Sequence, residues 1–183
     1  MSVDFARLQE IFLAAVERRR PDDRQAYLDQ ACASDDEMRR QVELLLKAHE
    51  EAGSVPGAQT DESDPTGAYD TAAEAMRRIL VDSARRKRAG KHGGGLRRVN
   101  LDARDALAAA PPDDLLAVDE ALERLTHHDP KAAQLVKLHC FAGLTVEQAA
   151  AALGLSRTHA YRLWTFARAW LYSQLAGDRD ADA

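Results

Sequence analysis

The chain has 183 residues, with 30 acidic and 25 basic side chains and a formal net charge of −5 at pH 7. Alanine and leucine account for 35 and 22 residues, whereas valine and isoleucine together number 11. This composition predicts an all-α protein of one or two small domains, because strands favour β-branched residues. No apolar run is long enough for a membrane span, no signal peptide is visible, and two distant cysteines fit reduced thiols. We therefore expect a cytoplasmic protein with no membrane partner.

Residues 1–51 are predicted to form an N-terminal segment of three helices. The first helix carries Phe5, Leu8 and other apolar residues on one stripe and ends before Pro21. A short second helix follows around residues 23–32. The third helix begins at a Ser-x-x-Glu capping box, Ser34 to Glu37. Residues 52–70, rich in Pro, Gly, Ser and acidic side chains, are expected to be a flexible linker.

The segment 71–98 is basic, with nine basic and two acidic side chains, and we expect a helix over residues 71–88. One face of this helix collects apolar and small residues, namely Ala72, Met76, Ile79, Leu80 and Ser83. The other face carries arginines, largely Arg77, Arg78, Arg85 and Arg88. Such charge at a helix end suits the helix dipole in any protein. With Arg86, Lys87 and further basic residues up to Arg98, however, the pattern favours contacts to nucleic-acid phosphates.

An acidic linker over residues 99–112 leads to four predicted helices in residues 113–176, followed by a tail at 177–183. We expect the first helix, over residues 113–126, to be capped by aspartate, and the second to begin at Asp129 with Pro130 in its first turn. Gly143 follows that helix at a position where left-handed backbone is needed. Thr145 and Gln148 form a second capping box, which opens a short helix to residue 153.

The segment 145–175 has the pattern of a helix-turn-helix. Gly154 supplies a sharp turn, and Ser156 caps the last helix. The core face of that helix is predicted to hold Ala160, Leu163, Trp164, Ala167 and Leu171. The residues left for DNA are Arg157, Thr158, His159, Tyr161, Arg162 and Thr165. An ordinary helical hairpin would fit the same spacing, but residues 131–175 hold five basic groups and one acidic group, which favours DNA.

At this point residues 71–176 resemble the extracytoplasmic-function (ECF) sigma factors of the sigma-70 class, in the subgroup common in planctomycetes. The resemblance is carried by four blocks in a fixed order: AMRRILVDSARRKRAGKHGGG, LLAVDEALERL, DPKAAQLVKLHCFAGLTVEQAAAALGLS and LWTFARAWLYSQL. It implies that residues 113–176 are sigma region 4, whose last helix reads the −35 promoter element. The expected readers are Arg157, Thr158, His159, Tyr161 and Arg162.

The same resemblance makes residues 71–98 the end of sigma region 2, whose basic helix lies against the −10 element. Its implied partners are promoter DNA and core RNA polymerase, and an anti-sigma or other regulatory protein is a further candidate. Nothing before Thr71 resembles the helices of region 2 that bind the polymerase clamp or melt the promoter. Residues 4–54 instead resemble a helical segment that precedes some bacterial Ser/Thr kinase domains, but no kinase motif follows.

Other classes of function find little support in the sequence. No Ser/His/Asp or paired-carboxylate pattern indicates an enzyme, and the glycines at 93–95 lack the features of a nucleotide loop. The histidines and cysteines lack the paired spacing of a zinc site, so we expect neither metal nor cofactor. Two alternatives to a sigma-like factor stay open: a helix-turn-helix regulator without sigma activity, and a protein-interaction module that retains a degenerate sigma remnant.

Overall fold

The structure is a computed structural model that describes residues 4–33, 35–52, 68–89 and 110–180. Eight helices and no strand occur in these ranges, which confirms the all-α prediction. In chain order the helices are α1 (Phe5–Glu17), α2 (Pro21–Ala31), α3 (Asp36–Ala52), α4 (Ala68–Ala89), α5 (Pro112–His128), α6 (Pro130–Cys140), α7 (Val146–Ala152) and α8 (Arg157–Asp180). The predicted linkers at 52–70 and 99–112 lie largely outside the described residues, and α8 runs four residues beyond its predicted end.

Acidic caps start the two long helices of the N-terminal segment. The Asp4 carboxylate accepts hydrogen bonds from the backbone N–H groups of Ala6 and Arg7, at 3.1 and 3.3 Å. Asp35 accepts from the N–H of Met38 at 2.9 Å and so serves as the cap of α3. Ser34, the predicted cap, lies outside the described residues. A carboxylate at this position satisfies an orphan N–H and also complements the positive end of the helix dipole.

The predicted cap of α5 is wrong, whereas the predicted cap of α6 is confirmed. We expected aspartate to cap α5, but the helix begins at Pro112 after Pro111 and has no side-chain cap. Proline suits this position because its fixed φ is already helical and its missing N–H would have no intrahelical partner. Asp129 caps α6 as predicted, with its carboxylate 3.0 Å from the backbone N of Ala132.

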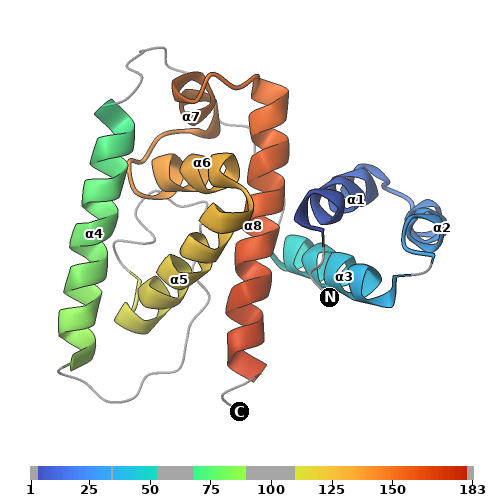
Figure 1. Ribbon diagram of the computed structural model, residues 1–183, viewed down its shortest axis with the longest axis horizontal. Helices are drawn as coiled ribbons and strands as arrows, with labels where there is room; N and C mark the ends of the chain where they lie inside the picture. Colours follow the sequence, from blue (N-terminus) through green and yellow to red (C-terminus); the bar gives the residue numbers. More distant parts are fainter. Residues whose placement is uncertain (1–3, 34, 53–67, 90–109, 181–183) are drawn as a thin grey trace.

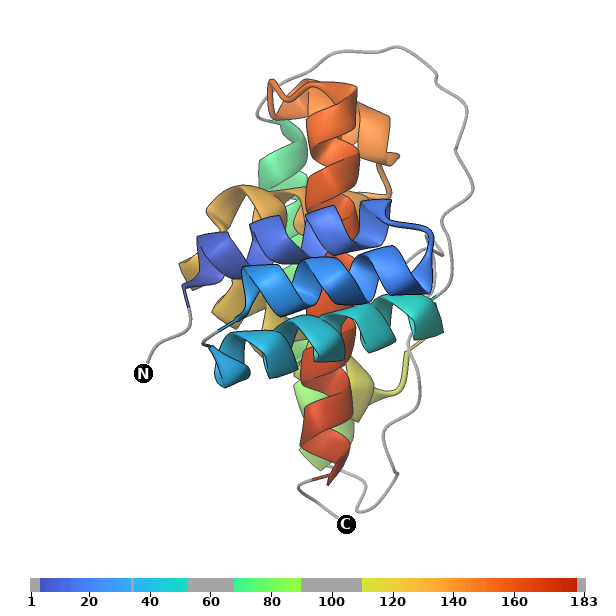
Figure 2. The same cartoon turned by 90° about the vertical axis from the view of Figure 1, so that its right-hand side faces the viewer.

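Helix α8 lies between two groups of helices. In Figure 1, α4, α5, α6 and α7 lie on one side of α8 and α1, α2 and α3 lie on the other. Seen from the side of α1–α3, these three helices lie one beside another and cross the middle of α8 (Figure 2). Residues 163–171 of α8 are consequently buried on almost every side, apart from the half-buried Thr165. The expected core residues of α8, Trp164 included, are all buried.

Aromatic rings join α1 to α8. Phe5 stacks on His128 with ring centroids 4.6 Å apart and meets Phe166 edge to face at 5.2 Å. Phe12, which is fully buried, meets Phe166 at 5.8 Å. Edge-to-face pairs of this kind add to the area buried. In the structure, the N-terminal segment therefore shares one continuous core with the C-terminal helices.

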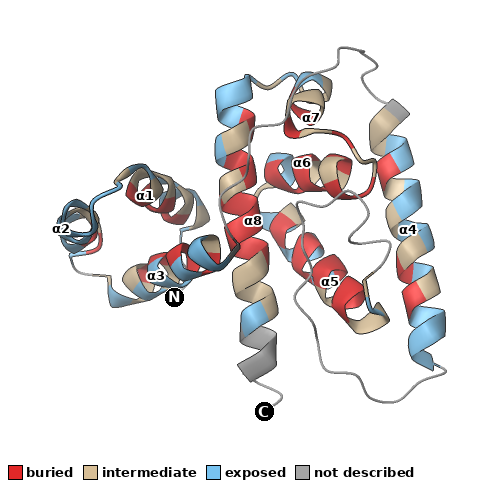
Figure 3. Cartoon of the chain, turned by 180° about the vertical axis from the view of Figure 1, so that it is seen from behind, coloured by how far each residue is buried: buried red, intermediate tan, exposed pale blue. Residues whose placement is uncertain are grey.

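Helix α4 faces the core largely with a side that the sequence pattern did not indicate, although Leu80 of the predicted apolar face is partly buried and packs against the core. Its buried residues are Ala73, Val81 and Ala84, which pack toward α5 and α6. Met76 and Ile79, on the predicted apolar face, are exposed instead. Figure 3 shows buried and exposed residues alternating along α4. Small side chains let α4 approach its neighbours closely, and that side also carries Arg77, whose partner is described below.

Candidate nucleic-acid interface

The helix-turn-helix is built by α7, a tight turn and α8. The Thr145 hydroxyl accepts from the N–H of Gln148, and the Gln148 side chain accepts from the N–H of Thr145, which confirms the predicted capping box. Gly154 has φ +63°, a left-handed conformation that glycine adopts at little cost. The backbone N–H of Leu155 then donates to the carbonyl of Ala150 at 2.8 Å, which closes the turn.

The first turns of α8 present a polar edge to solvent. Ser156 caps the helix by accepting from the N–H of His159 at 3.3 Å. Arg157, Thr158 and His159 are exposed, whereas Ala160 turns into the core. A helix N-terminus with exposed basic and hydroxyl side chains can reach base edges and phosphates in a major groove. The structure therefore leaves these three predicted site residues accessible.

Three other predicted readers on α8 have intramolecular partners. Arg162 is exposed and lies 3.9 Å from the Glu17 carboxylate, a loose contact between α8 and the end of α1. The Thr165 hydroxyl donates to the carbonyl of Tyr161 at 2.8 Å, so it points along its own helix. Tyr161 is half-buried and donates its hydroxyl to Glu147.

Glu147 is a residue of this site that our sequence analysis did not single out. Besides Tyr161, it accepts from Arg157 at 3.3 Å. Burial raises the pKa of Glu147, but the hydrogen bond from Tyr161 and the charge of Arg157 outweigh burial, and the net pKa lies below its usual value. Burial and the same carboxylate raise the pKa of Tyr161. A signal was present, because Glu147 is the single acidic residue in residues 131–175.

The basic residues of α4 divide into one buried group and several exposed ones. Arg77 has only 15% of its side chain exposed and donates to Asp119 of α5 and to Glu74. The hydrogen bond from Arg77 to Glu74, with the charges of Arg77 and Lys137, holds the pKa of Glu74 at about 2. Arg77 thus holds α4 to α5 in this structure. The remaining predicted residues of α4 are exposed: Arg78, Arg85, Arg86, Lys87 and Arg88.

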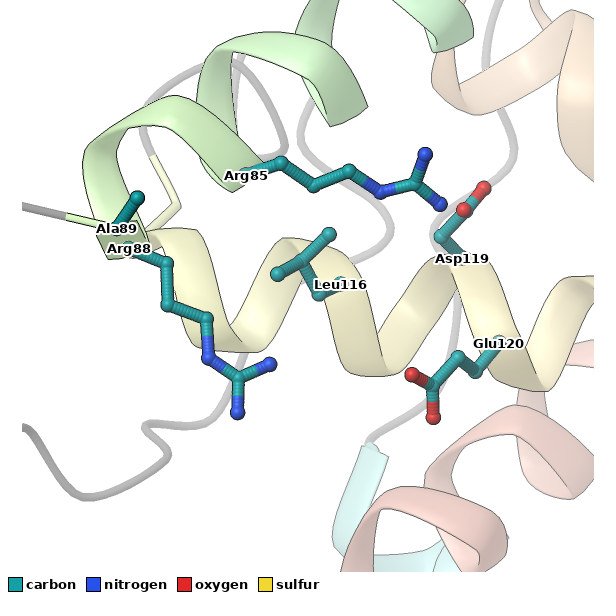
Figure 4. Close-up of a pocket in the computed structure, with 6 residues that line it drawn as sticks. All are labelled: Arg85, Arg88, Ala89, Leu116, Asp119 and Glu120. Atoms are coloured by element: carbon teal, nitrogen blue, oxygen red, sulfur yellow. The ribbon is translucent and has the colours of Figure 1, made fainter.

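The end of α4 borders a pocket of about 360 Å³ against α5 (Figure 4). In Figure 4 the Arg85 guanidinium points toward Asp119. Arg88 also pairs with Asp113 of α5, at 3.3 Å. The pocket is lined by Arg85, Arg88, Ala89, Leu116, Asp119 and Glu120. Two arginines and two carboxylates balance one another, so this pocket favours neither an anion nor a cation.

The structure does not bring the two basic groups together. The basic end of α4 and the first turns of α8 lie at opposite ends of the helical body (Figure 1). Within the described ranges no cluster of three or more histidine, cysteine or acidic residues has the arrangement of a metal site. Both cysteines, Cys32 and Cys140, are buried, and they are not joined by a disulfide bond. None of the described helices is long and apolar enough to span a membrane.

The geometry defines a helix-turn-helix protein, and comparison with known proteins identifies its family. The family model described as "ECF sigma factor" matches residues 52–177, more than half of the chain. The chain therefore belongs to the ECF sigma factor family, a family of non-enzymatic factors that act in transcription initiation. The match begins where α3 ends, so the N-terminal segment lies outside it. No curated protein and no solved structure matches the chain.

Proposed function

We propose that this protein binds promoter DNA through the first turns of α8 and core RNA polymerase as a sigma factor. The observation that carries the proposal is the exposed set Arg157, Thr158, His159 and Arg162, held on a helix-turn-helix in a chain of the ECF sigma factor family. In the complex α8 lies in the major groove of the −35 element. Arg157 exchanges its contact with Glu147 for a base edge or a phosphate, while Tyr161 keeps the carboxylate partnered.

The exposed end of α4 makes a second contact in this proposal. Arg85, Arg86, Lys87 and Arg88 form a short run of exposed positive charge, and the nearby acids with exposed side chains are Asp82, Asp113 and Glu120. Such a run neutralises phosphates irrespective of base sequence. Because it lies at the far end of the body from the first turns of α8, it contacts a different stretch of the promoter (Figure 1). Arg77 is left out of this contact because its guanidinium is engaged by Glu74 and Asp119.

The first test is DNA binding by the double variant Arg157→Ala and Arg162→Ala. We expect each substitution to weaken binding by about 1–3 kcal/mol where the arginine contacts a base. The probe is a duplex selected from a random library by the wild-type protein, and the readout is fluorescence anisotropy. Arg40→Ala is a matched control, because Arg40 and Arg157 are each 66% exposed and each pairs with a glutamate.

Equal affinity of the double variant and the wild type would show that α8 is not the reading helix. Affinity that does not fall as salt rises would exclude phosphate contacts and favour a protein-interaction module instead. Transcription in vitro with core RNA polymerase on the selected duplex tests the sigma role separately. Initiation that requires this protein supports a sigma factor, whereas binding without initiation identifies a helix-turn-helix regulator.

A further inference from the structure

Helix α4 is apolar on two opposite sides, and only one of them is covered. The inner side, with Ala73, Val81 and Ala84, is buried against α5 and α6. We call the opposite side, Ala72, Ala75, Met76 and Ile79, the outer stripe; all four residues are exposed. Met76 is 45% exposed and Ile79 is 60% exposed. Since α4 lies at the edge of the body, nothing among the described helices lies beyond this stripe (Figure 1).

The spacing of the outer stripe is that of a helix-packing surface. Its residues follow one another at i, i+3, i+4 and i+7, which aligns them along two turns of α4. Three large hydrophobic side chains are exposed in the part of the chain that the structure describes, and two of them lie on this stripe. The third is Leu44 on α3, which stands alone. Two large apolar side chains on the same face of one helix, three positions apart, indicate a surface on which another helix can pack.

The charges beside the outer stripe determine which kind of helix it fits. Arg78, Arg85, Arg86 and Lys87 are exposed along α4, with Asp82 as the one exposed acid of this stretch. The other acids of α4 have partners: Glu74 pairs with Arg77 and Lys137 and also lies 3.3 Å from Arg78, and Asp70 accepts from Gln134 at 3.3 Å. The Arg78 side chain is still 73% exposed. The surface is therefore apolar in the middle and positive at its margin. Carboxylates complement it.

Two other occupants fit the same surface less well. Single-stranded nucleic acid is held mainly by stacking of bases on aromatic rings, and residues 71–89 contain no aromatic side chain. A second copy of this chain would bring another positive margin and only Asp82 as an acid. Like charges would then face each other across much of the contact.

We propose that the outer stripe of α4 docks an acidic amphipathic helix of a partner protein. The apolar side chains of that helix cover Met76 and Ile79, and its carboxylates pair with Arg78 and Arg86. This docking does not depend on DNA binding by α8, because α5 and α6 lie between α4 and α8 and the outer stripe faces away from them (Figure 1). It assigns a role to a face of the family-matched region that the other described helices leave uncovered.

The experiment uses the full chain and a fluorescent helical peptide of about 18 residues, with leucine at every third or fourth position and glutamate elsewhere. We expect the peptide to bind the wild type. Ile79→Ser should weaken binding about tenfold or more, because the apolar area that Ile79 buries against the peptide is lost. Leu44→Ser is the matched control, since Leu44 is 47% exposed on another helix. Both substitutions are on the surface, so neither should unfold the protein. The same peptide with lysine for glutamate should not bind.

Absence of peptide binding, or equal weakening by Leu44→Ser, would overturn the proposal. A dimer in sedimentation that Ile79→Ser abolishes would also overturn it, in favour of a second copy. An Ile79→Cys variant tests whether the chain covers its own stripe, because Cys32 and Cys140 are buried. Rapid thiol labelling that the acidic peptide slows supports the proposal. Slow labelling in the free protein would mean that another part of the chain occupies the surface.

Discussion

Glu147 shows how one carboxylate positions side chains of the surface that we propose for DNA binding. It receives hydrogen bonds from Arg157 and Tyr161, so it orients two candidate DNA contacts from the neighbouring helix α7. The side chain is shielded enough for burial to oppose its charge, and the two donors offset that cost. Arg157 remains largely exposed, so it can leave Glu147 for DNA without unfolding the turn. Glu147 then still accepts the hydrogen bond from the Tyr161 hydroxyl.

The lowered pKa of Glu74 predicts that the contact between α4 and its neighbours weakens in acid. Its pKa is about 2 in the folded protein and near 4.5 without the partners, so the folded state binds fewer protons between these values. Stability is therefore fully present above about pH 4.5 and is lost as pH falls toward 2. We expect Glu74→Gln to lower the free energy of unfolding by roughly 1–2 kcal/mol at pH 7, allowing for partial solvent screening.

Urea denaturation at pH values from 7 to 2.5 measures this effect. Glu74→Gln should lose less stability than the wild type between pH 4.5 and 2.5. Glu43→Gln is the control, because Glu43 pairs with Arg39 at 2.9 Å but is exposed. Parallel curves for the wild type and Glu74→Gln would contradict the lowered pKa.

The turn between α7 and α8 depends on one backbone conformation. Gly154 has φ +63°, and a Cβ atom placed there meets nothing within 4 Å. The expected cost of Gly154→Ala therefore comes from the left-handed backbone alone, about 1–2 kcal/mol. We expect Gly154→Asn to cost less, since asparagine tolerates this region better. The urea midpoints of the wild type, Gly154→Ala and Gly154→Asn measure these costs. An alanine variant as stable as the wild type would show that the turn can change its conformation.

Helix α4 illustrates the limit of periodicity in a single helix. Its sequence contains two apolar arcs on opposite sides, one of small residues and one with Met76 and Ile79. Hydrophobic pattern alone favours the larger side chains as the buried face. The fold selects the smaller ones, because Arg77 on that side meets Asp119 of α5 and the small residues allow a close approach.

The N-terminal segment and the family-matched region pack as one body. Phe12 is fully buried beside Phe166, and Phe5 reaches His128 and Trp170. We expect Phe12→Ala to lower the free energy of unfolding by about 3–5 kcal/mol. Both tryptophans of the chain, Trp164 and Trp170, lie on α8, but Trp170 also meets Phe5 of α1. The experiment therefore uses a Trp170→Phe background, in which the remaining Trp164, beside His139 of α6, reports on the C-terminal helices.

If the two parts unfold together, Phe12→Ala shifts the tryptophan transition and the helical circular dichroism transition by the same amount. A tryptophan transition that stays in place while part of the helical signal melts earlier would show that α1–α3 unfold independently. Leu44→Ala serves as a control, because Leu44 belongs to α3 but does not lie in the core.

Local features of the sequence predicted much of this protein correctly. The all-α class, the caps at Asp129, Thr145 and Ser156, and the core face of α8 were predictable from composition and from patterns of residues at most four positions apart. The family resemblance also rested on the chain alone, and the family match confirms it. The predicted aspartate cap of α5 was wrong, because proline and aspartate at adjacent positions both mark the start of a helix.

Tertiary structure decided what depends on residues distant in sequence. Arg77 was grouped with the exposed arginines, since nothing near it in sequence shows that Asp119, 42 positions away, engages it. The docking of α1–α3 across α8 and the bare outer stripe of α4 are likewise results of packing. The sequence by itself therefore determined the helices, their caps and the family, because these depend on local backbone and side-chain chemistry. Only the tertiary structure decided which charges are free, because a charged group is free only when no distant element supplies its counter-ion.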